Sequence, residues 1–108
     1  MALPDGLLEA AKNHLDMTWT LSAGETAKLE GNLARGIKYL DSIAGETLHY
    51  TEEGAPRGLL LDYVRYARSN ALDEFAGNYQ HELLRLQMDC QIARQIAVDE
   101  AAEGGDGA

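Results

Sequence analysis

The stretch from Ser22 to Gly45, SAGETAKLEGNLARGIKYLDSIAG, contains a helix with its own start and stop signals. It opens on Ser22-Ala-Gly-Glu25, a capping box in which the Ser22 hydroxyl accepts from the N–H of Glu25 and the Glu25 side chain reaches back to the N–H of Ser22. Apolar residues then recur at intervals of three and four, namely Leu29, Leu33, Gly36 or Ile37, Leu40, and Ile43 or Ala44. Gly45 follows as a left-handed C′ residue. This pattern predicts a long helix with one buried face.

Three further helices are predicted around this one. Helical spacing of apolar residues extends over residues 5–15, 57–75 and 79–102. Pro56 suits the first turn of a helix, and residues 45–55 between the helices predict a loop with several acids and no base. The expected fold class is all-α, a small four-helix subunit with a long C-terminal helix.

Composition limits the size and the partners of the chain. Its 108 residues predict one helical domain over residues 1–102, followed by a disordered, Gly-rich, acidic tail over residues 103–108. The net charge is −9, and both halves of the sequence are acidic, so tight binding to nucleic acid phosphates is not expected. No apolar run has the length of a membrane span, and the first residues lack the pattern of a signal peptide. We therefore expect a protein made in the cytoplasm, with no membrane partner.

The residue types that carry catalysis are scattered. His14, His49 and His81 lie in different predicted elements, which disfavours a metal site. Cys90 lies on the apolar face of the last helix, where a small core residue is favoured over a nucleophile. The glycines match no phosphate-binding or dinucleotide-binding motif. We predict no enzymatic activity, no catalytic residues, no metal and no cofactor.

One segment of the third predicted helix has the composition of an interface. It interleaves apolar residues with Tyr63, Arg65, Tyr66, Arg68 and Asn70. Tyr and Arg are enriched where proteins contact one another, so these five residues are predicted subunit-interface residues. The alternative is a core helix whose polar side-chain ends reach water.

Trp19 lies between the first two predicted helices. It is predicted to cover their junction as part of the core, because a large aromatic side chain buries much apolar surface. Binding of a partner by Trp19 is the alternative.

Two blocks of the sequence, together with its length and acidity, resemble the head–tail connector proteins (adaptor or head-completion proteins) of long-tailed phages. The first is Leu15-Asp-Met-Thr-Trp-Thr20, followed by the helix that ends in Gly36-Ile-Lys-Tyr-Leu-Asp-Ser-Ile-Ala-Gly45. The second is the block from Pro56 to Phe75, followed by Asn78-Tyr79 and an amphipathic helix. The resemblance covers residues 5–95.

The resemblance implies a structural virion protein located at the head–tail junction. Its subunits would form a homo-oligomeric ring, dodecameric in the virion, which docks on the portal protein after DNA packaging. The ring would extend the DNA channel toward the tail and meet a head-closure or tail-completion protein. Packaged DNA would pass through without specific binding.

The last predicted helix loses large apolar residues after Ile96 and gains acids, which oppose the helix dipole near its C-terminus. We therefore expect residues 94–108 to be dispensable for the fold and for most ring formation, and free to become ordered on a partner. The resemblance makes the portal that partner, with Arg94, Gln95, Val98 and Asp99 as candidate contacts. A solubilising tail is the alternative.

Two other classes of protein remain open from the sequence. A small acidic regulatory or inhibitor protein that binds a single protein partner would have a similar composition. A helical DNA-binding regulator is disfavoured, since no predicted helix is basic. The size of the protein in solution separates the first class from a connector, which should form rings.

Overall fold

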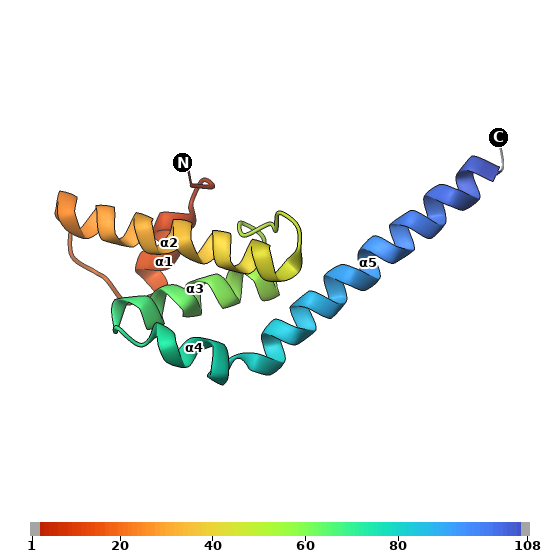
Figure 1. Cartoon of the computed structure of the whole chain (residues 1–108). Helices are drawn as coiled ribbons and strands as arrows, with labels where there is room; N and C mark the ends of the chain where they lie inside the picture. Colours follow the sequence, from red (N-terminus) through yellow and green to blue (C-terminus); the bar gives the residue numbers. More distant parts are fainter. Residues whose placement is uncertain (1–2, 107–108) are drawn as a thin grey trace.

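The computed structural model describes residues 3–106, and the side chains of residues 3–101. This part of the chain folds into five α-helices, α1 (Leu7–His14), α2 (Ala23–Ala44), α3 (Ala55–Arg68), α4 (Leu72–Asn78) and α5 (Gln80–Asp106). The all-α prediction is confirmed, with one helix more than the sequence predicts. Figure 1 shows α2 and α3 side by side, α1 across one face of the pair, and α5 extending away from them.

The predicted ends of α2 are confirmed. Both hydrogen bonds of the capping box are present, each at 3.1 Å between Ser22 and Glu25. Gly45 has the left-handed conformation, with φ of 75°, and its N–H donates to the carbonyl of Asp41. Pro56 lies in the first turn of α3. Backbone N–H groups in this turn have no partner within the helix, so the lack of an N–H in Pro56 costs no hydrogen bond.

The prediction of one continuous helix over residues 57–75 is wrong, because the chain turns between Arg68 and Leu72. Asn70 has a φ of 57°, and the N–H of Ala71 donates to the carbonyl of Tyr66 at 2.8 Å. These are the features of a helix end closed by a left-handed residue, a position that Asn tolerates. The short helix α4 then returns Phe75 to the core, so the helical spacing of apolar residues continues across a break.

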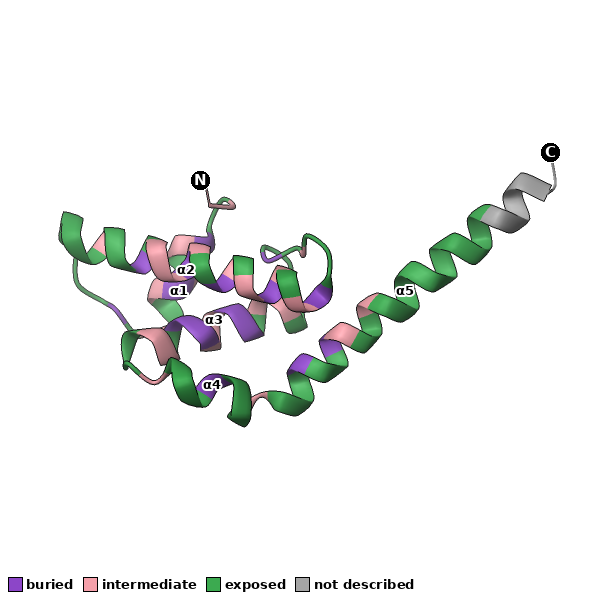
Figure 2. Cartoon of the chain, viewed as in Figure 1, coloured by how far each residue is buried: buried purple, intermediate pink, exposed green. Residues whose placement is uncertain are grey.

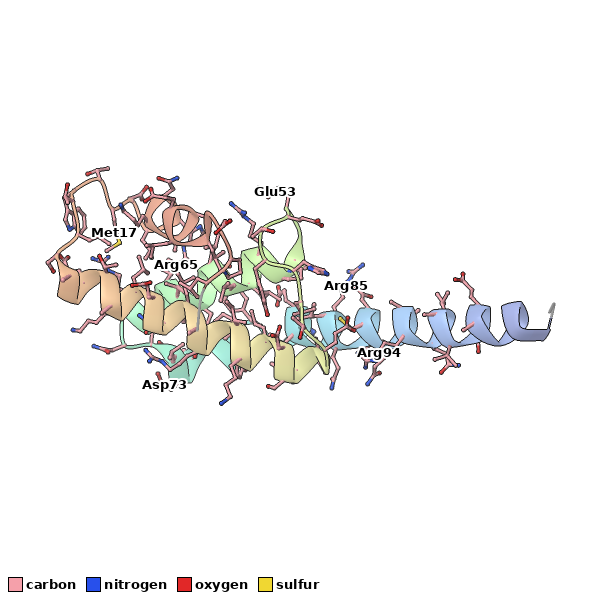
Figure 3. All side chains as sticks on the ribbon, turned by 90° about the horizontal axis from the view of Figure 1, so that it is seen from above. Met17, Glu53, Arg65, Asp73, Arg85 and Arg94 are labelled. Carbon is pink, nitrogen blue, oxygen red and sulfur yellow. The ribbon has the colours of Figure 1, made fainter. Side chains whose placement is uncertain are left out.

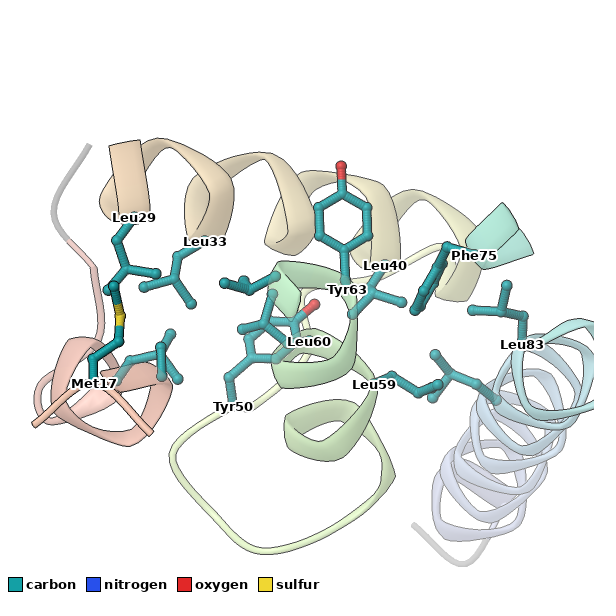
Figure 4. Packing of buried hydrophobic residues seen from close by; sticks show 14 residues of the cluster. Met17, Leu29, Leu33, Leu40, Tyr50, Leu59, Leu60, Tyr63, Phe75 and Leu83 are labelled. Atoms are coloured by element: carbon teal, nitrogen blue, oxygen red, sulfur yellow. The ribbon is translucent and has the colours of Figure 1, made fainter. Parts of the chain in front are cut away.

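The core lies mainly between α2 and α3, and α1, α4 and the start of α5 close its ends. Figure 4 shows Leu33, Leu40, Leu60 and Phe75 within one continuous apolar cluster, and Figure 2 shows the buried residues gathered on the facing sides of the helices. Gly36 permits the close approach of α2 to α3. A Cβ atom at this position would lie 2.6 Å from Cδ1 of Leu60.

The loop between α2 and α3 is fixed by one carboxylate. Oδ1 of Asp41 accepts from the N–H of Leu48 at 3.0 Å and from the hydroxyl of Tyr50 at 2.6 Å. The Tyr50 ring is buried, and burial together with the Asp41 carboxylate raises the pKa of its hydroxyl. The loop therefore contributes to the core.

Helix α5 makes the molecule elongated. The extents are 58 × 29 × 20 Å, and the radius of gyration is 16.7 Å, whereas about 13 Å is expected for a compact chain of this length. Every described side chain from Gln91 onward is exposed. The helix continues to Asp106, past the predicted end of the domain at Ala102, and residues 107–108 of the predicted tail lie outside the described residues. None of the described helices is long and apolar enough to cross a membrane.

Candidate interaction surfaces

The structure divides the five predicted interface residues into a buried aromatic part and an exposed polar part. The buried part belongs to a cluster of rings from α2, α3, α4 and the α4–α5 junction. Tyr63 is buried, with its ring centroid 5.5 Å from that of Tyr39 and 5.4 Å from that of Phe75. Tyr63 is thus a core residue, and the prediction that it lies on the surface is wrong.

Tyr66 is half-buried beside the same cluster. Its ring meets those of Phe75 and Tyr79 edge to face, each at 5.5 Å, and its hydroxyl accepts from Nδ2 of Asn78 at 3.1 Å. Edge-to-face aromatic pairs stabilise a fold beyond the area that they bury. The tyrosines of α3 therefore connect α3 to α4 within one chain.

Arg65, Arg68 and Asn70 are exposed and remain candidates for contact with a partner. Arg65 lies 4.0 Å from the carboxylate of Asp62 on its own helix. The guanidinium of Arg68 lies over the ring of Trp19, 5.9 Å from its centroid, at cation–π distance. Arg68 and Asn70 thus lie together at the C-terminal end of α3, whereas Arg65 lies one turn earlier.

Trp19 is on the surface, which makes the prediction of a core role wrong. The residue is 46% exposed, and its Nε1–H donates to Oε2 of Glu25 at 3.3 Å. The backbone N–H of Ser22 and the Trp19 indole stabilise the Glu25 carboxylate and lower its pKa. Met17 and Leu29 belong to the buried core, and Trp19 does not.

A hollow of about 530 Å³ opens between α2 and the end of α3 beside Trp19. We name it the α2–α3 hollow, and its lining residues are Met17, Glu25, Lys28, Leu29, Asn32, Arg35, Ala67, Arg68, Asn70 and Leu72. Three of the nine basic residues of the chain line it, against one acid. In a protein with a net charge of −9, this is a local basic surface with an apolar floor.

The second candidate surface is α5. Leu84, Met88, Ile92 and Ile96 follow one another at intervals of four residues, and with Val98 they are 48% to 62% exposed. Side chains at this spacing lie on one side of a helix. Near the start of α5, Leu83 and Leu86 are buried against the body, and Leu84, about half exposed, lies at the edge of the body beside Ile43 and Ala76. No described residue of the chain covers this stripe.

Arg94 makes the last described hydrogen bonds and ion pair between α5 and the body. Its Nη1 donates to the carbonyl of Ala44 and to Oε1 of Glu46, each at 2.8 Å. The positive charge of Arg94 also interacts favourably with the negative, C-terminal end of the α2 dipole. Arg94 was predicted as a portal contact, but here it joins α5 to the C-terminus of α2 (Figure 3).

The other three candidate portal residues, Gln95, Val98 and Asp99, project beyond this anchor. Nε2 of Gln95 donates to Oδ1 of Asp99 at 3.1 Å, one turn along the helix, and Val98 is exposed. These residues are therefore placed where a partner can reach them.

Of the groups that could carry chemistry, His14, Asp62 and Tyr79 meet in one cluster, and Cys90 lies near Glu46. His14 meets Asp62 at 3.0 Å, and the hydroxyl of Tyr79 donates to the other Asp62 oxygen at 3.0 Å. Burial and the Asp62 carboxylate raise the pKa of Tyr79 to about 12. Cys90 is half-buried, and burial followed by the nearby Glu46 raises the pKa of its thiol. Among the residues that the structure describes, no group of three or more His, Cys, Asp or Glu side chains could hold a metal ion.

A comparison of the chain with protein-family models, with curated proteins and with solved structures finds no match.

Proposed function

We propose that this chain is the subunit of a ring-forming head–tail connector of a long-tailed phage, a structural virion protein without enzymatic activity. The proposal rests on the resemblance of residues 5–95 to connector proteins and on the placement of the exposed surfaces. The ring would dock on the portal after DNA packaging and extend the DNA channel toward the tail.

The observation that carries the proposal is the presence of two different exposed surfaces at opposite ends of an elongated molecule. The α2–α3 hollow lies beside Met17 at one end, and the projecting part of α5 forms the other (Figure 3). A ring needs a heterologous contact, in which one surface of a subunit meets a different surface of the next. A small inhibitor that binds a single partner needs only one such surface.

The acidic surface also suits a channel. A net charge of −9 repels phosphates, so DNA would slide past the ring without adhering to it. A gel-shift experiment at about 150 mM salt should show no complex with duplex DNA, because non-specific binding needs several phosphate contacts.

Negative-stain imaging of the concentrated protein, combined with complementation of a connector-deficient phage, tests the proposal. We expect rings in the images and infectious particles from the complemented phage. A protein that stays small at every concentration and restores no infectivity would favour the alternative, a regulatory or inhibitor protein with one partner.

A chain that ends at Arg94 tests whether the projecting part of α5 binds a partner at all, either the portal or the next subunit. This chain keeps the anchor to α2 and loses Gln95, Val98 and Asp99. We expect folded protein that attaches poorly to DNA-filled heads and gives few infectious particles. Full infectivity would leave residues 95–108 as a solubilising tail.

A further inference from the structure

The projecting end of α5 and the α2–α3 hollow have opposite charges. Residues 95–106 of α5, which we name the distal segment, contain four acids and no base. The hollow carries three bases, Lys28, Arg35 and Arg68, against the single acid Glu25. Opposite charges across an interface set its orientation and speed the encounter of the partners.

The apolar residues of the two surfaces also match. The hollow has an apolar floor, made by Met17, Leu29, Ala67 and Leu72. On the distal segment, Ile96 lies three and four residues before Asp99 and Glu100, so these three side chains share one face of the helix. That face presents an apolar residue followed by two carboxylates, which suits an apolar floor with a basic rim.

The two surfaces cannot meet within one chain. Figure 1 shows α5 leaving the body at the side away from the start of α2, and Arg94 fixes its direction through Ala44 and Glu46. The distal segment extends about 18 Å past this anchor, since an α-helix rises 1.5 Å per residue. It is therefore placed to reach a second copy of the chain.

We propose that the distal segment of α5 binds in the α2–α3 hollow of a neighbouring copy, with Ile96 on the apolar floor and with Asp99 and Glu100 against Lys28 and Arg68. The contact is head to tail, so it leaves each subunit with one free hollow and one free helix for the next copy. The contact itself does not depend on the proposed function. Only the closure of a row of such subunits into a ring rests on it. The contact places two predicted interface residues, Arg68 and Asn70, and the predicted portal residue Asp99 between the same two subunits, whereas Val98 lies on the other side of the helix from Ile96. The distal segment would then bind the next subunit instead of the portal, and ring formation would depend on it.

Charge reversal and its rescue test this contact in the full-length protein. One variant carries Lys28→Glu and Arg68→Glu in the hollow, and the other carries Asp99→Lys and Glu100→Lys on α5. Each variant alone should raise the concentration for half assembly by about tenfold or more, as measured by sedimentation velocity. A mixture of the two, or a chain with all four changes, should assemble again, because acids then face bases at every contact.

A matched control carries Lys38→Glu and Arg85→Glu. Both residues are exposed and lie outside the lining of the hollow, and the change in net charge equals that of the hollow variant. This control should assemble as the wild type does. Circular dichroism of all variants should be alike, since every substituted side chain is exposed.

The outcomes separate this contact from the proposed function. Assembly that survives both reversals, or that is lost and not rescued by the mixture, overturns the contact, while rings and infectivity would still support a connector. Assembly that survives both reversals is also the result expected if the exposed apolar side chains of α5 pair with those of a second α5, because the changes in the hollow would not disturb that pairing. Charge-dependent rescue of open filaments without rings would support the contact and contradict the ring. A wild-type chain that stays monomeric at every concentration overturns the contact, and infectivity then decides on the connector.

Discussion

The first and second parts of α5 have similar residue types and different surroundings. In residues 80–90, Leu83 and Leu86 are buried against the body, and Cys90 is half-buried. In residues 91–101, Ile92, Ile96 and every other described side chain are exposed. The first part is held by buried apolar contacts, whereas the second has only the Arg94 anchor to α2 and, beyond it, its own backbone hydrogen bonds. A helix of this kind is marginal in water, so the distal segment depends on a partner for lasting order.

The largest effect should come from removing a ring in the body. Phe75→Ala removes a buried side chain that contacts Tyr39, Tyr63, Tyr66 and Tyr79, and should lower the free energy of unfolding by about 3–5 kcal/mol. Ile96→Ala on the distal segment should change this free energy by about 0.5 kcal/mol or less. Urea denaturation measures both. Similar losses in the two variants would show that the distal segment is packed against the body in solution.

The next effect should come from the crossing of α2 and α3. Gly36→Ala places a methyl group 2.6 Å from Leu60 and 2.8 Å from Tyr63, so we expect a loss of about 1–3 kcal/mol from overpacking. Gly58→Ala is the matched control, because a Cβ there has nothing within 4 Å. The control should stabilise the helix by up to about 1 kcal/mol. Thermal unfolding of the pair should give shifts of opposite sign, and a stabilising Gly36→Ala would contradict the close crossing.

A smaller effect is expected at the junction between the two parts of α5. Arg94→Ala removes the hydrogen bonds to Ala44 and Glu46 and should cost about 1 kcal/mol, because the ion pair is partly exposed. Amide exchange of the residues around position 94 should speed up. Arg85→Ala is the control, because Arg85 lies on the same helix without this anchor, and it should leave amide exchange unchanged. Equal effects of the two substitutions on exchange would show that Arg94 does not anchor α5.

The smallest effect should come from the distal segment itself. A chain that ends at Arg94 should keep the free energy of unfolding of the full chain within about 0.5 kcal/mol, since the removed side chains that the structure describes are all exposed. A chain that ends at Ala93 also lacks Arg94, and its free energy of unfolding should be lower by a further amount equal to that measured for Arg94→Ala. Urea denaturation of the two truncated chains compares them directly.

The sequence predicted the features that depend on neighbouring residues. The capping box at Ser22, the C′ glycine at Gly45 and the proline in the first turn of α3 are all where the local pattern places them. The break at Asn70 was missed because the apolar spacing of α3 continues into α4. Ser69-Asn70 was the available signal, since Asn is one of the few residues that end a helix in the left-handed conformation.

Features that depend on distant residues could not be predicted in the same way. Trp19 is exposed although it is the largest apolar side chain of the first connection, whereas Met17 and Leu29 near it in the sequence are buried in the core. The anchoring role of Arg94 requires Ala44 and Glu46, about fifty positions earlier in the chain, to lie beside α5. The α2–α3 hollow likewise combines residues from positions 25–35 of α2 with residues from the C-terminal end of α3, so only the fold shows its basic character.

Hydrogen–deuterium exchange of the wild-type protein, measured at low and at high concentration, tests the central claim most directly. We predict fast exchange of residues 95–106 in dilute protein and slow exchange at high concentration, with side-chain footprinting that shows simultaneous protection of Lys28 and Arg68. The buried part of α5 should exchange slowly at both concentrations. Equal protection of the distal segment at both concentrations, or protection that appears without any change at the hollow, would contradict the account.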